Sequence, residues 1–306
     1  VDYADYIKDD KVLFQVLSNL HRFGLAFVQN IPKEVTGGGD NHKWLIENIA
    51  TRIGYIKETF YGRLFDVQAK AGAKNIAYTN VYLGLHMDLL YESPPGLQLL
   101  HSIVNQVEGG ESFFADSLNA AHYVWERDPK GYDALQNVPI VFNYINDDEY
   151  YYYQRPLLVT DPNKIDPETG VPEIKEINYS PPFQGPFEFG ISSPMKKIGQ
   201  FENLSEMDIN YRHSAKSSGD RYILRDFVKG YKTFEKFIYE KENQYRLKLE
   251  EGMCVLFDNR RVLHAREKFE IPENGDLEFA RWYKGCYIDG DAFYSKLRVL
   301  ERKFRE

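Results

Sequence analysis

The segment 254–264 reads CVLFDNRRVLH and places a histidine shortly after the apolar run Cys254–Phe257. Apolar runs of this length between polar residues are typical of short buried strands. An earlier segment, 85–88, reads LHMD. In an extended chain alternate residues point to the same side, so His86 and Asp88 share one face. His264 lies 178 residues after His86 (264 minus 86), which is consistent with two strands that meet across a β-barrel.

Short strand-like runs recur between Leu97 and the C-terminus, separated by Gly, Pro, Asn and Asp. The predicted strands are Leu97–Val104, Ile140–Ile145, Tyr150–Tyr153, Tyr245–Leu249, Cys254–Phe257 and Phe279–Ile288. The chain also holds 23 Tyr and 20 Phe in 306 residues, and aromatic residues favour strands and pocket walls over a helical bundle. We therefore expect a mainly antiparallel β fold.

Helices are expected to flank this β core. The first begins after a capping aspartate, Asp9 or Asp10, and ends at Gly24, with a strand Leu25–Val28 after it. Asp is favoured before a helix N-terminus and Gly after a helix C-terminus. A later helix, Tyr231–Ile238, places its apolar residues on one face. The sequence thus predicts helices that pack on a β core.

Several irregular segments are predicted to be loops. The stretch 161–172 is rich in Pro, Asp and Gly and predicts a surface hairpin or a lid. We expect the wider region 145–200 to form the lid, and residues 1–60 to pack on the β core within a single domain, 1–306. The glycine run Gly37–Gly39 lacks the Gly-Lys-Ser/Thr ending of a phosphate-binding loop, so we expect an ordinary loop there.

The composition argues against several classes of partner. The formal net charge is −8 and no long basic run occurs, so the sequence predicts no nucleic-acid binding. No apolar stretch approaches the roughly 18 residues needed to span a bilayer, and the start of the sequence resembles no signal or transit peptide. The two cysteines, Cys254 and Cys286, show no sign of a disulfide framework. These features favour an intracellular protein in the cytoplasm, with a mitochondrial location left open.

His86, Asp88 and His264 are the candidate metal ligands. Two imidazoles and one carboxylate on one face of an octahedron leave three adjacent positions open, which suits an iron(II) ion that must bind a bidentate 2-oxo acid and dioxygen. A zinc peptidase would carry His-Glu-x-x-His on a helix, and this motif does not occur in the sequence. The residue set therefore favours an iron(II) oxygenase over a zinc hydrolase.

Arg281 is the candidate residue for binding a co-substrate. It lies 17 residues after His264 (281 minus 264), on the predicted strand Phe279–Ile288. A buried guanidinium on this strand needs a carboxylate partner, and its planar fork matches a carboxylate through two parallel hydrogen bonds. The distal carboxylate of 2-oxoglutarate would suit Arg281.

Short motifs that are specific in combination are spread over nearly the whole chain. They are Thr59–Gly62 (TFYG), Asn75–Thr79 (NIAYT), His86–Asp88 (HMD), Pro94–His101 (PPGLQLLH), Gly109–Ser112 (GGES) with Asp116, Phe257–His264 (FDNRRVLH), and Arg281 followed by Gly285 and Tyr287. In these motifs the chain resembles the gamma-butyrobetaine and trimethyllysine dioxygenases, within the larger taurine-dioxygenase-like family of 2-oxoglutarate oxygenases.

This resemblance implies a double-stranded β-helix (jelly-roll) core with flanking helices. It also implies iron(II) at His86, Asp88 and His264. Arg281, with help from Ser112, would bind 2-oxoglutarate. Members of the family use dioxygen to couple the decarboxylation of 2-oxoglutarate to succinate with the oxidation of an unactivated C–H bond. Because the carboxylate ligand Asp88 is present, the halide position of related halogenases is not vacant, and hydroxylation is favoured over chlorination.

The resemblance also implies a substrate pocket. The butyrobetaine enzymes enclose a trimethylammonium group in aromatic rings, whose negative faces attract a cation. By motif position the corresponding residues are Tyr61, Phe65, Tyr78 and Tyr287, with Phe65 where tryptophan is expected. Asn75 falls where a substrate carboxylate would be met. The expected substrate is a small zwitterion such as gamma-butyrobetaine.

Two other functions stay open. A biosynthetic oxygenase would act on a free amino acid by hydroxylation, desaturation or ring closure. A jelly-roll protein that binds a metal or small ligand without catalysis would be expected to have a broken ligand set, whereas the set here is intact. Relatives are often dimers, so we also expect a homodimer, with residues 297–304 as a candidate interface.

Overall fold

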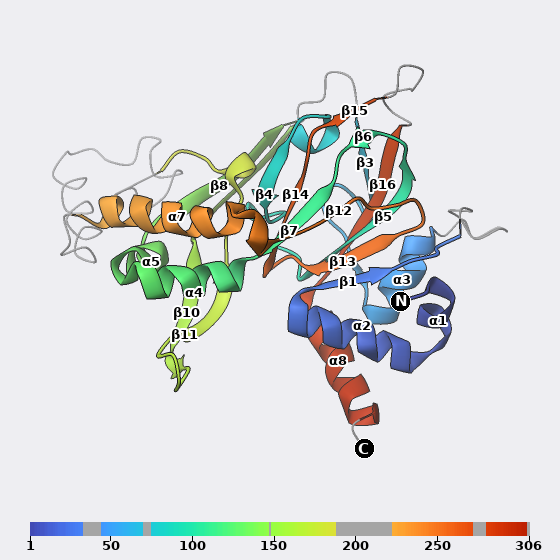
Figure 1. Cartoon of the computed structure of the whole chain (residues 1–306), viewed down its shortest axis with the longest axis horizontal. Helices are drawn as coiled ribbons and strands as arrows, with labels where there is room; N and C mark the ends of the chain where they lie inside the picture. The colour runs from blue at the N-terminus through green and yellow to red at the C-terminus, as the bar shows by residue number, and fades with distance from the viewer. Residues whose placement is uncertain (33–43, 70–74, 147, 188–221, 272–279, 305–306) are drawn as a thin grey trace.

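Two antiparallel sheets form the centre of the computed structural model (Figure 1), which describes residues 1–32, 44–69, 75–146, 148–187, 222–271 and 280–304. The larger sheet has the order β1-β13-β5-β16-β2, with β3 also paired to β16; its strands are β1 (Leu25–Val28), β13 (Cys254–Asp258), β5 (Leu97–Asn105), β16 (Arg281–Ile288), β2 (Ile56–Lys57) and β3 (Phe65–Gln68). The smaller sheet has the order β12-β7-β14-β4; its strands are β12 (Gln244–Leu247), β7 (Ser112–Asp116), β14 (Val262–Arg266) and β4 (Leu83–His86). The mainly antiparallel β core predicted from the sequence is confirmed.

The larger sheet separates two interiors, because its side chains alternate between its faces. On β5, Leu97 and Leu99 pack into the apolar core beneath the N-terminal helices. Gln98 and Leu100 of the same strand line a pocket between the two sheets. Between Leu97 and Leu100, odd-numbered residues of β5 therefore face the core under the helices, and even-numbered residues face the pocket. The pocket is separate from the core under the helices.

Four helices cover the outer face of the larger sheet, at the lower right of Figure 1. They are α1 (Tyr3–Lys8), α2 (Asp10–Phe23), α3 (Leu45–Ile53) and α8 (Gly290–Phe304). Asp9 caps α2 by accepting a hydrogen bond from the backbone N–H of Lys11, and Gly24 ends it with a left-handed φ of 73°. Both ends of α2 lie where the sequence predicts them, because each end carries its own local signal.

A second group of elements lies on the other side of the sheets, at the left of Figure 1. It contains the helices α4 (Ser117–Arg127), α5 (Pro129–Asn137) and α7 (Ile223–Tyr239), and two hairpins, β8 (Pro139–Asn146) with β9 (Glu149–Pro156) and β10 (Leu158–Ile165) with β11 (Pro172–Ile177). Short elements complete the described chain: β6 (Glu108–Gly109), β15 (Phe269–Glu270), and the 3-10 turns η1 (Ile76–Tyr78), η2 (Pro181–Phe183) and η5 (Lys241–Asn243). None of the described helices is long and apolar enough to span a bilayer.

Most predicted elements match these boundaries, but the helix predicted as Tyr231–Ile238 begins earlier, at Ile223. The predicted surface hairpin at 161–172 is the tip of the β10–β11 hairpin. The strand predicted as Tyr245–Leu249 ends at Leu247, where its partner β7 begins, so the chain has no strand to pair with beyond that point. Residues 297–304 belong to α8. Gly37–Gly39, Phe279 and residues 188–200 of the expected lid lie outside the described residues.

Candidate metal centre

Strand pairing brings the two candidate histidines together. His86 is the last residue of β4, and His264 lies within β14. Strand β14 lies between β4 and β7 in the smaller sheet. The Cα atoms of the two residues are direct partners in the β4–β14 ladder. Their ring centroids are 4.1 Å apart. Two residues that are far apart in the sequence are thus neighbours because of the sheet register.

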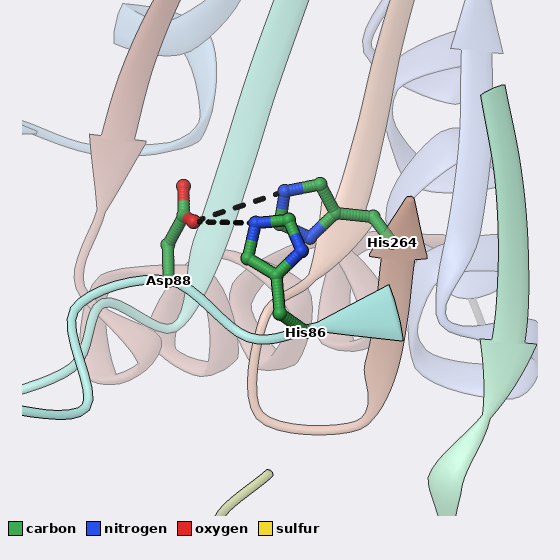
Figure 2. Close-up of side chains that lie close together, drawn as sticks. All are labelled: His86, Asp88 and His264. Atoms are coloured by element: carbon green, nitrogen blue, oxygen red, sulfur yellow. Dashed lines mark ion pairs between the residues drawn. The ribbon is translucent and has the colours of Figure 1, made fainter. Parts of the chain in front are cut away.

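Asp88 completes the cluster from a loop. It lies two residues beyond the end of β4, so it is not on the strand that would place it by alternation alone. Its Oδ1 is 3.3 Å from Nε2 of His86 and 3.8 Å from Nε2 of His264 (Figure 2). One ligand atom from each of the three residues lies within 4.8 Å of the others. The described structure therefore gathers all three predicted metal ligands at one point.

The protonation of these groups suits a metal ion, which binds neutral imidazole and ionised carboxylate. Burial, together with the neighbouring His86, lowers the pKa of His264 to about 3. Burial alone would raise the pKa of Asp88, but the two imidazoles and a hydrogen bond from Tyr287 outweigh it and hold this pKa below its usual range. Nδ1 of His86 lies 2.8 Å from the carbonyl oxygen of Gly84. Because a carbonyl only accepts, this contact places the proton on Nδ1 and leaves Nε2 free to bind a metal.

The predicted co-substrate residues, Arg281 and Ser112, lie in the same pocket as the candidate metal ligands. Arg281, on β16, is 3% exposed, and its guanidinium carbon lies 4.0 Å from the centroid of the Tyr283 ring. Its Nε is buried and has no hydrogen-bond partner within the described part of the chain. Ser112 is also buried and lines the same pocket. The predicted co-substrate residues therefore share one cavity with the metal ligands.

Arg266, on β14, is the second buried guanidinium. It donates hydrogen bonds to three backbone carbonyls, those of Ala77, Thr79 and Val81. Burial and the neighbouring Arg281 lower the pKa of Arg266 to about 9. Neither arginine forms an ion pair with a carboxylate among the described residues. Since an uncompensated buried cation is costly, the donors present fit an anionic ligand such as the dicarboxylate 2-oxoglutarate.

The structure brings the predicted substrate residues Tyr61, Phe65, Asn75, Tyr78 and Tyr287 into the same pocket. The Phe65 and Tyr287 rings are stacked, with centroids 4.8 Å apart. The side chain of Asn75 donates to the Tyr61 hydroxyl and accepts from the backbone N–H of Ala77. Within the described residues, the second amide hydrogen of Asn75 makes no hydrogen bond. The roles of these residues in binding a substrate stay predictions.

Some lining residues escaped the sequence analysis. Arg266 lies two residues after His264 on β14 and faces the same pocket, so the alternation argument applied to His86 and Asp88 would have found it. Tyr91 and Phe183 also line the pocket. They lie outside regular strands, where no periodic pattern indicates which way a side chain points.

Comparison with known proteins agrees with this site. The family described as taurine catabolism dioxygenase TauD, TfdA family matches residues 1–287. The probable oxidoreductase AIM17 of Saccharomyces cerevisiae is 38% identical over 99% of this chain and 64% of its own length. A gamma-butyrobetaine dioxygenase of Pseudomonas sp. (strain AK-1) is 30% identical over 98% of this chain and 66% of its own length. The chain thus spans slightly less than two thirds of each relative.

A solved structure of an asparagine oxygenase in complex with Fe(II), 3-hydroxyasparagine and succinate has the same fold, with a TM-score of 0.57 and 11% identity over 91% of this chain and 79% of that one. The likeness confirms the predicted jelly-roll core with flanking helices. The matched family is one of dioxygenases, which agrees with the predicted class of enzyme. The chain belongs to the taurine catabolism dioxygenase TauD, TfdA family.

Proposed function

We propose that the protein hydroxylates a small zwitterion with a cationic amine and a carboxylate, such as gamma-butyrobetaine, while 2-oxoglutarate is converted to succinate. The observation that carries this proposal is the shared pocket. The metal ligands, the buried Arg281 and all the predicted substrate residues line one cavity. A substrate held there would lie beside both the metal and the co-substrate.

The chemistry of the pocket wall supports a cationic head group. Asp88 is the only carboxylate among the described residues that line the cavity, and it is engaged at the metal cluster. A cation would therefore be bound by aromatic faces, which attract it by about 0.5–2 kcal/mol per ring. Tyr61, Phe65 and Tyr287 supply such rings. The remaining amide hydrogen of Asn75 would bind the substrate carboxylate.

The protein's own contribution would be positioning. Iron(II), when bound by His86, Asp88 and His264, supplies the dioxygen chemistry that oxidises the C–H bond. Arg281 would hold the distal carboxylate of 2-oxoglutarate through its guanidinium fork. The aromatic residues would fix the substrate and keep bulk water from the reacting carbon. Each group acts from a buried or partly buried place in the pocket.

A second candidate is a biosynthetic oxygenase that acts on a free amino acid by hydroxylation, desaturation or ring closure. The stacking of Phe65 on Tyr287 favours it, because each ring then has only one face left for a ligand. Rings with one free face each would attract a quaternary ammonium group less strongly, which would suit an unmethylated amine. A third reading, a binding protein without catalysis, is disfavoured because the ligand set His86, Asp88 and His264 is intact and gathered.

The test is a turnover assay with iron(II), 2-oxoglutarate and oxygen that measures succinate and, by mass spectrometry, the oxidised product. Gamma-butyrobetaine, trimethyllysine and a panel of free amino acids are compared, with His86→Ala as the control. The proposal predicts that quaternary amines stimulate succinate formation and gain one oxygen atom. Stimulation by unmethylated amino acids alone would support the second candidate. Failure to form succinate with any compound would support the third.

A further inference from the structure

The three metal ligands are held in place by different means. His86 and His264 are on paired strands, so the ladder fixes their backbones. Asp88 lies beyond the end of β4. The next residue, Leu89, has a left-handed φ of 62° and so turns the chain away from the strand direction, a conformation that is uncommon for a residue other than glycine. Sheet pairing therefore does not extend to Asp88.

The side chain of Asn259 makes the hydrogen bonds to the Asp88 backbone that a paired strand would otherwise make. The Oδ1 atom of Asn259 accepts a hydrogen bond from the backbone N–H of Asp88 at 2.9 Å, and its Nδ2 donates to the carbonyl oxygen of Asp88 at 3.0 Å. Asn259 is fully buried and lies in the turn between β13 and β14, five residues before His264 (264 minus 259). The Asn259 carboxamide thus satisfies both backbone polar groups of Asp88, its N–H and its C=O, as a neighbouring strand would.

The carboxylate of Asp88 is held by a second contact, from the opposite sheet. The Tyr287 hydroxyl, on β16, donates a hydrogen bond to Oδ2 of Asp88 at 2.7 Å. The other oxygen, Oδ1, is the one that lies near both histidine Nε2 atoms. Tyr287 is buried, with 3% of its surface exposed. Oδ2 of Asp88 therefore accepts the hydrogen bond from Tyr287, while Oδ1 faces the two histidines.

We infer that Asn259 and Tyr287 are positioning residues for the metal centre: Asn259 fixes the backbone of Asp88, and Tyr287 occupies Oδ2 so that only Oδ1 is offered to the metal. A carboxylate that binds through one oxygen leaves the positions that a bidentate 2-oxo acid and dioxygen require. Partners of this kind usually change metal affinity by about 10–100-fold when they are removed. The inference rests on the metal cluster and does not depend on which substrate is bound.

The inference assigns Tyr287 a task that its aromatic ring does not perform. As a wall of the substrate pocket Tyr287 would act through its ring, whereas here it acts through its hydroxyl. The variant Tyr287→Phe keeps the ring and removes only the hydroxyl. A change in metal binding in this variant would therefore belong to the hydrogen bond with Asp88 and not to the aromatic wall.

The experiment titrates the full, metal-free chain with cobalt(II), without co-substrate, and records the visible absorption spectrum, which depends on the number of ligands around cobalt. We expect Asn259→Ala to weaken cobalt binding by about 10–100-fold. Tyr287→Phe should weaken it less and should change the spectrum, because the freed Oδ2 can then also bind. Asn259→Asp keeps the acceptor for the Asp88 N–H but loses the donor, and it should lie between the wild type and Asn259→Ala.

Two matched controls lie outside the cluster. Tyr179→Phe removes another buried hydroxyl that donates to a carboxylate, that of Glu235. Asn178→Ala removes another buried carboxamide that bridges two groups, the carbonyl of Pro156 and the guanidinium of Arg260. Both controls should keep the affinity and the spectrum of the wild type. A purely structural role of Asn259 or Tyr287 would lower the melting temperature of the metal-free chain and leave cobalt binding unchanged.

Wild-type cobalt affinity and spectrum in both Asn259→Ala and Tyr287→Phe would overturn the inference. If Asn259→Ala does not fold, Asn259→Asp and Tyr287→Phe decide the outcome by the same two readouts. Because the assay uses the metal alone, its result is separate from that of the turnover assay. The inference about Asp88 can thus hold even where gamma-butyrobetaine is not a substrate.

Discussion

The two ends of the pocket are built in different ways. At the metal end, strand pairing and hydrogen bonds fix His86, Asp88 and His264. At the guanidinium end, Arg281 rests on the face of the Tyr283 ring, and its buried Nε has no partner within the described residues. At the metal end the side chains are thus held by contacts within the protein, whereas at the guanidinium end Arg281 Nε has no such contact among the described residues.

This difference indicates that the two ends should respond separately to change. A buried cation without a counterion costs free energy, and a bound dicarboxylate would remove that cost. Substitutions at the metal end should therefore alter metal affinity and leave dicarboxylate binding in place. Substitutions at the guanidinium end should do the reverse.

The largest effect is expected from His264→Ala or His86→Ala. Each removes a predicted metal ligand, so metal affinity should fall by more than the roughly 100-fold that marks the loss of an outer partner, and succinate formation should cease. Cobalt(II) titration measures the first and the turnover assay the second. His101→Ala, which removes a buried histidine that does not line the pocket, is the control. Unchanged metal affinity in His264→Ala would show that the cluster is not the metal site.

Arg281→Ala should have the next largest effect. Loss of charge-assisted hydrogen bonds worth about 1.5–3 kcal/mol should raise the KM for 2-oxoglutarate by about 10–100-fold, with cobalt(II) affinity unchanged. Arg281→Lys keeps the charge but not the planar fork, so it should recover only part of the loss. The control is Arg261→Lys, outside the pocket, where the arginine pairs with Asp116. A wild-type KM in Arg281→Ala would place the co-substrate elsewhere.

Gly285→Ala should give a smaller effect, confined to the space between the two ends. A Cβ atom at Gly285 would overlap the ring of Phe65, so the ring must leave its stack on Tyr287. Overpacking of this kind costs about 1–3 kcal/mol of unfolding free energy. The KM for the organic substrate should rise while cobalt(II) affinity and the KM for 2-oxoglutarate stay constant. A change in all three parameters would mean that the pocket does not behave as separate ends.

The smallest expected effect is a thermal shift. Glutarate, a dicarboxylate without the 2-oxo group that would bind a metal, should raise the melting temperature of the metal-free protein by about 3–6 °C at 100 times its Kd. The shift should be absent in Arg281→Ala and should persist in His264→Ala. A shift that requires the metal would contradict the idea that the guanidinium end binds its anion independently.

The sequence predicted the parts of the site that depend on regular periodicity. His86 and His264 follow from strand patterns, and Arg281 follows from the alternation of β16. The prediction placed Asp88 on the same extended segment as His86, whereas the strand ends before it. Its position depends instead on Asn259, whose side-chain contact with Asp88 spans 171 residues of sequence.

Contacts of this kind are not readable from periodicity, since a buried Asn in a turn has the same local pattern whether or not its carboxamide holds another backbone. The same limit applies to the pocket wall. Tyr91 and Phe183 lie in irregular segments, where the direction of a side chain depends on tertiary packing. Helix α8 (Gly290–Phe304) was not predicted from the sequence, although Asp289, a residue type favoured before a helix N-terminus, comes immediately before it.

Strand β16 comes last among the described strands, yet it lies inside the larger sheet, where it pairs with β5, β2 and β3. During translation the edge of β5 that pairs with β16 therefore stays unpaired until residues 281–288 leave the ribosome. An open edge of this length is a template for pairing with another chain. A shortened product that lacks β16 should consequently aggregate, so the amount of folded protein depends on complete synthesis of residues 281–288.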